Sequence, residues 1–325
     1  MLSKGCSLLK RGVNDPHKTV RSFHQKFQTI DLEVASLYNK MALDDEICDI
    51  INEDWDNLII LDACRYDFFA EQNNIDGELK RKVSSGSDSW GFMKHNFEGR
   101  KLHDTVYITS NPHVDRLSDG VFFKIENTLD EWDSTIEVVH PETIVKTAKK
   151  AHKSHPKKRL IVHFMQPHTP WLGPTADGIR AKYNVKGNNK NHGKAKLGIE
   201  TEDPRSGDVG WFELVKRGDV SHDKMRQAYC ETLNFVLDYT DELIKSLPGK
   251  SVVTSDHGEM LGERLGVRRR YGHFSANYWT EELRYVPWLE ISSDNRRKLV
   301  ESEPKENSQM DSDIIEDRLQ ALGYK

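Results

Sequence analysis

Cysteine is scarce in this sequence, and the cysteines that are present are scattered. The chain of 325 residues has four, and no two of them have the spacing of a CxxC pair. A zinc site built on thiolates and a disulfide framework are therefore both disfavoured. Because disulfides are typical of oxidising compartments, a reducing compartment is the simpler interpretation.

Long apolar runs are absent as well. No stretch approaches the roughly 20 apolar residues that cross a bilayer. The N-terminus places Lys4, Lys10 and Arg11 around two leucines, without the apolar core of a signal peptide. We therefore expect a cytoplasmic protein without a transmembrane segment. The basic, partly amphipathic first 30 residues leave open a peripheral position on a membrane.

Charge of one sign is the third feature that the sequence lacks. Asp and Glu number 52 and Lys and Arg number 47, so the formal net charge is -5. A general nucleic-acid surface would require a strong positive excess, and we therefore expect no nucleic-acid partner. The sequence also contains no internal repeat and no low-complexity segment.

The sequence does contain a series of short apolar runs. They occur at residues 58–61, 106–109, 160–165 and 252–254. Continuous apolar runs of this length are typical of central parallel strands, and amphipathic helical patterns such as that of residues 221–247 lie between them. The alternation predicts an α/β fold with a mostly parallel central sheet and helices on both faces.

One further run, at residues 286–291, contains a proline at position 287. Proline has no backbone N–H to donate to a central ladder of hydrogen bonds. We therefore expect this strand at an edge of the sheet.

The chain divides into a main domain with an extension at each end. Residues 1–49 have a polar, helical pattern and form an N-terminal extension, whereas residues 50–295 hold all the predicted strands. Within this domain, residues 173–220 are expected to form a loop or lid insertion, because Gly, Asn and Lys cluster there. Residues 296–325 form a charged C-terminal tail with a short helix.

Residues 251–263, SVVTSDHGEMLGE, give the strongest local signal of a site. The β-branched residues favour a strand and Gly258 permits a sharp turn, so Asp256 and His257 are expected at the carboxyl end of that strand. A carboxylate and a neutral imidazole both suit zinc or manganese. Taken alone, such a pair is more often a helix N-cap with a polar neighbour.

Other polar side chains also fall at predicted strand ends. They are Asp62, the serines of residues 84–89, His163, His168 and, after a glycine, His273. Because the carboxyl ends of parallel strands meet at one edge of a sheet, we expect these groups near Asp256 and His257. Carboxylates, imidazoles and a hydroxyl are what metal-assisted phosphoryl or sulfuryl transfer requires.

Five motifs, in this order, carry a family resemblance. They are LDACRYD at 61–67, a hydroxyl-rich turn at 84–89, HFMQPHTP at 163–170, SDHGEMLGE at 255–263 and Gly-His at 272–273. The chain resembles the alkaline phosphatase-like superfamily over residues 50–295. Its sulfatase-like branch, which includes lipoteichoic acid synthases and phosphoethanolamine transferases, is the most similar. The resemblance implies an alkaline phosphatase-like fold and makes residues 50–295 the catalytic domain.

The resemblance also implies the metal ligands. Asp62 matches the acid of the first strand, and Asp256 with His257 matches the pair that shares a metal with it. His273 matches a later histidine that lies on a second metal or on the charged group of the substrate. One or two divalent ions are expected, zinc or manganese first, with calcium or magnesium as further candidates.

The nucleophile of the family is a Ser, a Thr or a modified Cys that opens the helix after the hydroxyl-rich turn. Ser87 is the first candidate and Ser89 the second, while a helix cap is the alternative role for Ser87 or Ser85. Cys64 lacks the Cys-x-Pro-x-Arg or Cys-x-Ala-x-Arg pattern of the oxidised cysteine in true sulfatases. We interpret it as a small buried residue, which makes sulfate ester hydrolysis less favoured.

The remaining candidates each have two interpretations. His168 matches a catalytic histidine that contributes to the second site or contacts substrate oxygens. His163 has the same role or is a core histidine, because it lies within a strand. Arg65 suits a substrate oxyanion, with an ion pair to Asp67 as the alternative. Glu259 orients a metal ligand or is a solvated acid.

We therefore predict a metal-dependent hydrolase or transferase that acts on phosphate or sulfate esters through a covalent seryl intermediate. The partner is expected to be a phosphate or sulfate ester, with a glycan or a lipid-linked molecule as the candidate carriers of the ester group. The alternative is a catalytically inactive sulfatase-like fold that binds a polyanionic glycan or a partner protein. A hydroxyl within reach of Asp62, Asp256 and His257 discriminates the two, because covalent catalysis requires one.

Overall fold

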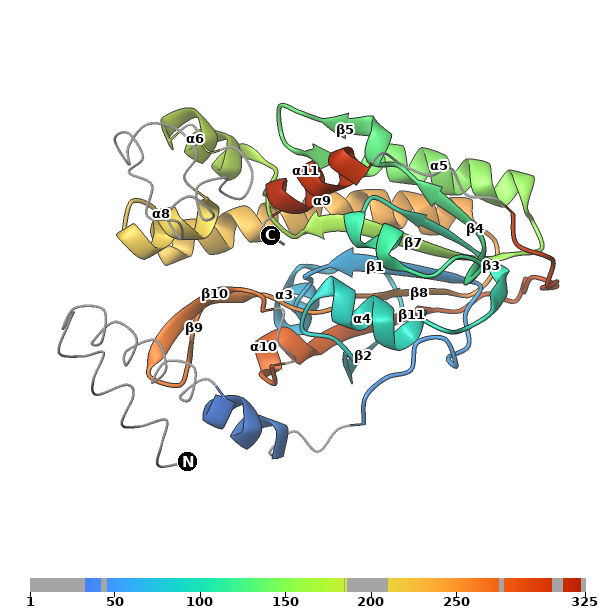
Figure 1. Cartoon of the computed structure of the whole chain (residues 1–325), viewed down its shortest axis with the longest axis horizontal. Coiled ribbons are helices and arrows are strands. Elements are labelled where there is room, and N and C mark those ends of the chain that lie inside the picture. Colours follow the sequence, from blue (N-terminus) through green and yellow to red (C-terminus); the bar gives the residue numbers. More distant parts are fainter. Residues whose placement is uncertain are drawn as a thin grey trace, which may run out of the picture.

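A seven-stranded sheet organises the part of the chain that the computed structural model describes, with the strand order β2-β11-β8-β1-β7-β3-β4 (Figure 1). The described residues are 33–41, 46–183, 185, 210–274, 278–305 and 312–322. The strands of this sheet are β1 (Asn57–Asp62), β2 (Glu78–Val83), β3 (Leu102–Thr109), β4 (Phe122–Asn127), β7 (Arg159–Pro167), β8 (Ser251–Thr254) and β11 (Tyr285–Ile291).

The sheet is mixed but mostly parallel. β1 runs parallel to both β7 and β8, and β3 runs parallel to both β7 and β4. Only β11 runs in the opposite direction, since it is antiparallel to both of its neighbours, β2 and β8. Every residue of β1 is buried, as expected for an apolar run that is covered on both faces. The predicted fold class is confirmed.

The predicted edge position of residues 286–291 is wrong, because β11 lies between β2 and β8. Pro287 lies opposite Arg81 of β2, whereas the pairing of β11 with β8 starts one residue later, at Trp288. The proline therefore occupies the part of the strand that has a neighbour on one side only, where a missing N–H is tolerated.

Helices cover the two faces of the sheet (Figure 1). On one face, α5 (Pro141–Ser154) and α9 (His222–Ser246) pack against Ile59 and Leu61 of β1. On the other face, α4 (Ser89–Asn96) packs against Leu58 and Ile60. Alternate side chains of β1 therefore enter different cores, which follows from the two-residue period of a strand.

Smaller elements surround the carboxyl ends of the parallel strands. They are α3 (Tyr66–Gln72), η1 (Pro112–Arg116), α8 (Trp211–Arg217), the antiparallel pair β9 (Met260–Leu265) and β10 (Arg268–Gly272), and α10 (Glu281–Arg284). Elsewhere lie η2 (Leu129–Glu131), the short pair β5 (Trp132–Asp133) and β6 (Val138–Val139), α6 (Pro174–Tyr183) and α11 (Ser312–Ala321). None of the described helices combines the length and the apolarity that a membrane crossing requires.

The described part of the predicted loop or lid at 173–220 contains two helices, α6 and α8. They pack on a shared apolar cluster that includes Trp171 and Trp211, whose rings are 5.3 Å apart. The Gly- and Lys-rich part of this segment, at 186–196, lies outside the described residues.

Of the N-terminal extension, residues 33–41 and 46–49 are described, and residues 33–41 are helical. The Ser36 hydroxyl accepts a hydrogen bond from the Trp279 backbone N–H at 3.0 Å, which ties this helix to the segment before α10. Val34, Leu37, Tyr38 and Met41 are 60–81% exposed, so the helix turns its large apolar side chains to solvent.

Candidate functional site

The carboxyl ends of three adjacent strands carry the predicted site residues. β1 lies between β7 and β8 and runs parallel to both, so their carboxyl ends meet at one edge. Asp62 ends β1, and the backbone N–H of the next residue, Ala63, donates to Asp256 Oδ1 at 3.1 Å. The sheet thus brings together two acids that are far apart in the sequence.

Asp62, Asp256 and His257 form a first ligand group. Each offers one ligand atom, these atoms all lie within 4.8 Å of one another, and none of the three residues is exposed. Ser89 lies against this group, because its hydroxyl donates to Asp62 Oδ2 at 3.0 Å and is 3.4 Å from His257 Nε2. The hydroxyl that covalent catalysis needs is therefore within reach of the predicted metal ligands.

The turn before α4 separates the two candidate serines. Asp88 is the N-cap of α4, and its side chain accepts from the Gly91 backbone N–H at 2.7 Å. Capping is thus performed by an aspartate and not by Ser85 or Ser87. Ser89 is the first helical residue and points to the ligand group, whereas the Ser87 hydroxyl donates to the backbone oxygen of Phe274 at 3.2 Å.

His168, Glu259 and His273 form a second ligand group. Their ligand atoms also lie within 4.8 Å of one another, and His273 Nδ1 is 3.3 Å from Glu259 Oε1. The rings of His257 and His273 are 4.6 Å apart, so the two ligand groups are neighbours. Glu259 is 1% exposed, which excludes a solvated acid. The sequence signal for its role was its place two residues after His257, on the same turn.

The two ligand groups bring three buried carboxylates close together. Asp62, Asp256 and Glu259 are each at most 1% exposed, and one carboxylate oxygen of each has no hydrogen-bond partner among the described residues. Ionised carboxylates buried in this way are costly unless a cation neutralises them. The oxygen and imidazole donors fit zinc or manganese, and the two groups provide for one or two ions.

Burial and neighbouring charges shift the pKa values of these residues. Burial raises the pKa of Asp256, but the neighbouring His257 and His163 outweigh it and hold this pKa below its usual range. Burial and then the neighbouring Asp256 carboxylate raise the pKa of Asp62 well above its usual range. Burial raises the pKa of Glu259 to about 7. Burial lowers the pKa of His168 to about 4, and the His273 imidazole is the next cause. Burial lowers the pKa of His273 to about 3, and the His257 imidazole is the next cause. Both imidazoles are therefore neutral at pH 7, as metal ligands must be.

Asn111 also belongs to the site, although we did not single it out from the sequence. Its side-chain amide donates to Asp62 Oδ2 at 2.9 Å, so Asp62 accepts from Asn111 and Ser89 on the same oxygen. The available signal was the polar stretch Ser-Asn-Pro-His at the end of the predicted strand 106–109. Two donors on one oxygen fix the orientation of this carboxylate.

His163 lies inside the sheet, between the acids of the first ligand group. Its Nε2 is 3.7 Å from both Asp62 Oδ2 and Asp256 Oδ2, and its Nδ1 is 2.8 Å from the Tyr107 hydroxyl. The residue is fully buried, as the core interpretation requires. Its contacts nevertheless make it a neighbour of the metal ligands, so the two interpretations of His163 do not exclude each other.

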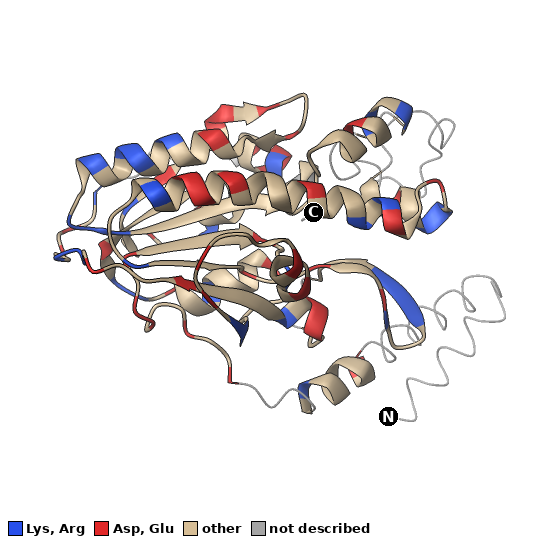
Figure 2. Ribbon diagram, turned by 180° about the vertical axis from the view of Figure 1, so that it is seen from behind, with Lys and Arg blue, Asp and Glu red and all other residues tan. Residues whose placement is uncertain are grey.

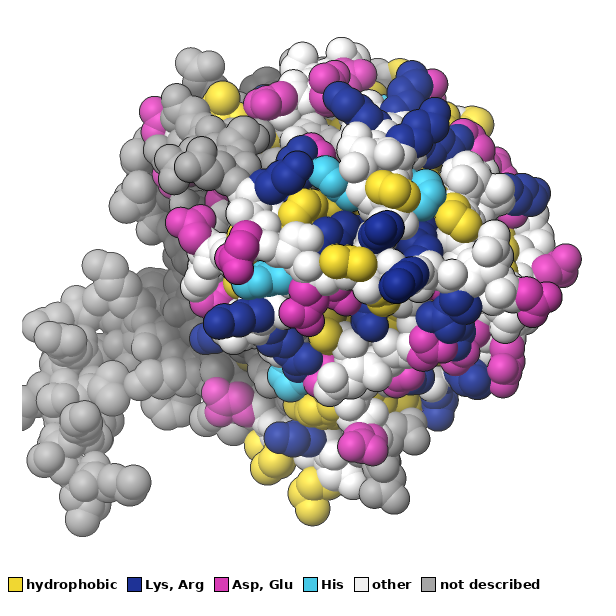
Figure 3. All heavy atoms as spheres, turned by 90° about the vertical axis from the view of Figure 1, so that its right-hand side faces the viewer, with side chains coloured by type: hydrophobic (Ala, Val, Ile, Leu, Met, Phe, Trp, Pro, Cys, Tyr) yellow, Lys and Arg dark blue, Asp and Glu magenta, His cyan; other side chains and the backbone are white. Residues whose placement is uncertain are grey.

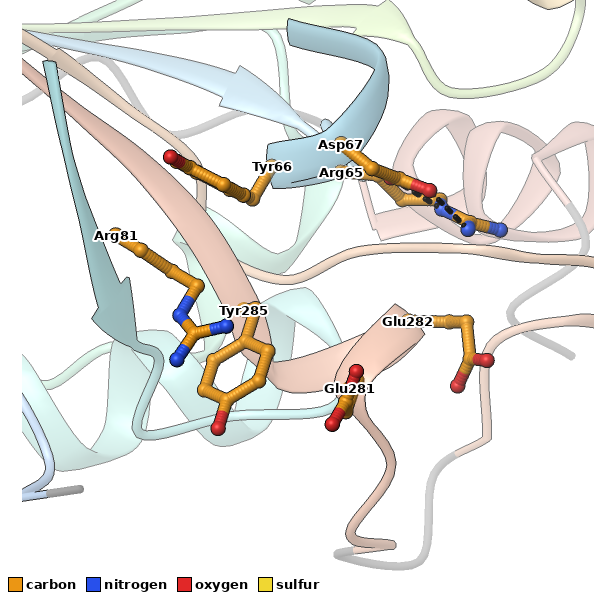
Figure 4. Close-up of a pocket in the computed structure, with 7 residues that line it drawn as sticks. All are labelled: Arg65, Tyr66, Asp67, Arg81, Glu281, Glu282 and Tyr285. Carbon is orange, nitrogen blue, oxygen red and sulfur yellow. Dashed lines mark hydrogen bonds and ion pairs between the residues drawn. The ribbon is translucent and has the colours of Figure 1, made fainter. Parts of the chain in front are cut away.

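Arg65 is paired with acids. Its guanidinium donates to Asp67 at 2.9 Å and to Glu263 at 2.7 Å, and also to the backbone oxygen of Glu259 at 3.3 Å. Arg65 lines a pocket of about 220 Å³. Figure 4 shows Arg81 close to the Tyr285 ring on another side of this pocket. No member of either ligand group lines this pocket. The ion pair with Asp67, which was the alternative for Arg65, is the one that forms.

Residues 88–324 match the model of the family described as Sulfatase. The chain belongs to the sulfatase family. The predicted resemblance to the alkaline phosphatase superfamily is thereby confirmed, and this sulfatase-family protein stands among enzymes that act on sulfate and phosphate esters. The match includes Ser89 and all three residues of the second ligand group, whereas Asp62 precedes it.

Several solved structures are similar to parts of this sulfatase-family chain. The C-terminal periplasmic domain of EcEptC from Escherichia coli, in complex with Zn, is 14% identical, with a TM-score of 0.47 over 76% of this chain and 75% of that one. The corresponding domain of the phosphoethanolamine transferase EptC from Campylobacter jejuni is 14% identical, with a TM-score of 0.44 over 77% and 83%. BT1596, a 2-O GAG sulfatase, is 14% identical, with a TM-score of 0.43 over 77% and 65%. No curated protein sequence matches the chain significantly.

Proposed function

We propose that this protein is a metal-dependent enzyme that transfers phosphoryl groups from phosphate esters through a covalent intermediate on Ser89. The observation that carries the proposal is the position of the Ser89 hydroxyl, 3.0 Å from Asp62 Oδ2 and 3.4 Å from His257 Nε2. A serine hydroxyl is a poor nucleophile unless its pKa is lowered by such an environment.

A divalent ion held by Asp62, Asp256 and His257 would lower the pKa of the neighbouring hydroxyl and neutralise the oxygens of the ester. The chain's own residues supply the positioning. Asp62 accepts the Ser89 hydrogen bond and is itself held by Asn111. In the first step the bond from Ser89 Oγ to phosphorus forms while the bond to the leaving oxygen breaks. In the second step water or an acceptor alcohol takes the phosphoryl group from Ser89.

A phosphate ester is favoured over a sulfate ester because of the residue at the start of α4. Ser89 holds the position next to the first ligand group, and no cysteine is available there for oxidation. Cys64 is fully buried, and burial raises the pKa of its thiol well above the usual range. The side chain that true sulfatases modify is thus replaced by an ordinary alcohol, whose phosphoester is a familiar enzymatic intermediate.

The test is a substrate panel with two serine variants. Metal-free protein is reloaded with zinc or manganese and assayed with p-nitrophenyl phosphate, bis(p-nitrophenyl) phosphate and p-nitrophenyl sulfate. We expect turnover of a phosphate ester, a loss of about 10³-fold or more in Ser89→Ala, and a change within a few fold in the matched variant Ser87→Ala. Acid quenching and mass spectrometry should find a phosphoryl group on Ser89.

Two results would contradict the proposal. One is Ser89→Ala activity close to that of the unmodified protein. The other is turnover of the sulfate ester alone, which would place the protein with the sulfate hydrolases of its family.

A further inference from the structure

The helix of residues 33–41 has an apolar side that faces away from the rest of the protein. Val34, Leu37, Tyr38 and Met41 have the i, i+3, i+4, i+7 spacing of a single helix face, and each is 60–81% exposed. We call these four residues the apolar stripe. A surface helix of a globular domain normally turns such a stripe toward the core. Here the stripe lies on the outside and forms a ready-made apolar surface.

The other side of this helix holds it on the domain. The buried Ser36 hydroxyl accepts the Trp279 backbone N–H at 3.0 Å, and the Lys40 ammonium lies 5.4 Å from the centre of the Trp279 ring. Ala35 packs on an apolar cluster that includes Leu265 of β9. These contacts fix the orientation of the helix and thereby keep the apolar stripe outside.

The turn of the β9–β10 hairpin extends this surface. Val267 in the turn is 65% exposed and follows Leu265, against whose cluster the helix packs, by two residues. Figure 1 shows the helix in dark blue beside the hairpin. Among the described residues, Val267 and the apolar stripe are the large apolar side chains that are more than half exposed. Figure 3 views the opposite end of the molecule, where acidic and basic side chains are spread among one another.

The same hairpin turn is basic. Residues 264–270 contain four arginines and no acid, and Arg264, Arg268 and Arg269 are exposed. Figure 2 shows Lys and Arg along one strand of the hairpin and a mostly uncharged helix below it. The acids nearby have bases beside them: Glu263 lies between Arg65 and Arg226 at 2.7 and 2.8 Å, Glu33 shares the helix with Lys40, Asp223 precedes Lys224, and Glu281 and Glu282 line a pocket with Arg65 and Arg81.

We propose that the apolar stripe and the hairpin turn dock this protein on the surface of an anionic lipid bilayer. The apolar side chains enter the boundary between headgroups and acyl chains, and the arginines of the turn meet the anionic headgroups. The sequence that adjoins the helix has the same charge preference, because residues 1–32 contain six Lys and Arg against two Asp.

A bilayer fits this surface better than a folded partner or a second copy of the chain. A helix of this length is about 14 Å long and about 10 Å wide. Its outer side is therefore far smaller than the roughly 800 Å² that each partner of a standard protein interface buries. A bilayer requires no matching surface of that size, because single side chains insert into it. Nucleic acid would engage the arginines but would leave the apolar stripe in water.

The hairpin joins this surface to the ester site. Glu259 directly precedes β9 and His273 directly follows β10, and the six residues of β9 span at most about 20 Å. A docked protein therefore holds its second ligand group close to the bilayer. The proposal concerns docking alone, so it stands or falls independently of the role proposed for Ser89.

The test is co-sedimentation of the full chain with lipid vesicles. One set contains equal parts of phosphatidylcholine and phosphatidylserine, and the other contains phosphatidylcholine alone. We expect tighter binding to the mixed vesicles, which weakens as salt is added. Leu37→Gln/Met41→Gln should bind them about tenfold or more weakly, because two inserting side chains are lost. Arg264→Gln/Arg268→Gln should lose about as much on the mixed vesicles and little on phosphatidylcholine.

The matched control is Val300→Gln/Ile314→Gln, which makes the same exchange at two side chains away from the apolar stripe, each 39% exposed. It should change vesicle binding by less than about twofold. Glutamine is a good helix former, so the helix of residues 33–41 is retained in the stripe variant. Thermal melts and turnover of a soluble phosphate ester check that each variant keeps its fold and its site.

Three outcomes would overturn the proposal. The first is an unmodified protein that does not bind the mixed vesicles. The second is equal binding by the stripe variant and the control variant. The third is a dimer in sedimentation velocity that Leu37→Gln/Met41→Gln converts to a monomer, which would assign the apolar stripe to a second copy of the chain.

Discussion

At the scale of single residues, the position of the hydroxyl depends on which side chain caps α4. Ser87 was the first candidate nucleophile in the sequence because the family's nucleophile opens the helix after the hydroxyl-rich turn, and a helix cap was its alternative role. Asp88 takes the cap instead, so the helix begins at Ser89 and turns its hydroxyl toward Asp62. Sequence alone does not decide which of three consecutive polar residues starts a helix, because all three satisfy the same backbone donors.

Glu259 gives a prediction about pH for the metal-free protein. Its pKa is about 7 in the folded state against 4.5 ordinarily, so between these values the folded state binds a proton that the unfolded state has lost. The stability that Glu259 contributes is therefore full below pH 4.5 and is lost as the pH rises through 7. The loss is on the order of 3 kcal/mol, from 1.36 kcal/mol per pKa unit.

This prediction is measured by urea unfolding in EDTA between pH 5 and pH 8. Glu259→Gln should lose less stability over this range than the unmodified protein, whereas the surface variant Glu303→Gln should follow the unmodified protein. Comparing variants is necessary because His168 and His273, whose pKa values are lowered, stabilise the fold as the pH rises toward 6.5. Identical pH profiles for Glu259→Gln and the unmodified protein would refute the assignment.

At the scale of elements, the turn before α4 has no room for a larger residue at Gly86. A Cβ atom there would lie 2.4 Å from the Phe92 backbone nitrogen and 2.7 Å from the Asp88 backbone oxygen. Gly86→Ala must therefore displace the start of α4 and with it Ser89. We expect a loss of about 1–3 kcal/mol in unfolding free energy and a fall in kcat that exceeds what the loss of folded protein explains.

The matched control for this variant is Gly178→Ala. Gly178 lies within α6, and a Cβ atom there would have no atom within 4 Å. Because alanine is the better helix former, this variant should be neutral or stabilising by up to about 1 kcal/mol. Chemical denaturation measures both variants, and full activity in Gly86→Ala would show that α4 tolerates the shift.

The elements that the sequence predicted are those whose burial decides their structure. The apolar runs that form β1, β3, β7 and β8 are covered on both faces, so their apolar composition predicts these strands. β2 has the sequence ELKRKV, and only its last residue is buried. It is a strand because β11 pairs with it. Hydrogen bonding to a neighbouring strand does not require an apolar composition, and for this reason β2 and the β9–β10 hairpin were not predicted.

The site residues also divide into those that the sequence predicted and those that it did not. Asp62, Asp256 and His257 stand at the ends of predicted strands, and parallel strands bring their ends together. Glu259 and Asn111 lie in turns that follow strands, where side-chain direction depends on local backbone conformation. Their roles became visible only through the distances to Asp62 and His273.

At the scale of the whole molecule, the buried acids predict a strong effect of metal removal. Three carboxylates without a counter-cation destabilise the fold, and an ion that binds only the folded state stabilises it. At an ion concentration of 1,000 times the Kd the gain is about 4 kcal/mol per site. Zinc or manganese added to EDTA-treated protein should therefore raise Tm by several degrees.

Asp256→Asn supplies the control for this measurement. It removes one ligand of the first ligand group, so the Tm of the variant should respond little to added ion. Elemental analysis of both proteins gives the stoichiometry. An unmodified protein whose Tm changes with neither EDTA nor metal would contradict the assignment of the two ligand groups.

The β9–β10 hairpin would give a bound ion a mechanical role. Glu259 directly precedes β9 and His273 directly follows β10, so both ends of one hairpin lie in the second ligand group. A divalent ion held by these two side chains would close the hairpin at its base as a reversible cross-link, in the way that a disulfide closes a loop. Arg264, Arg268 and Arg269 are exposed on this hairpin. The rate at which trypsin cuts there then becomes a direct reporter of ion occupancy.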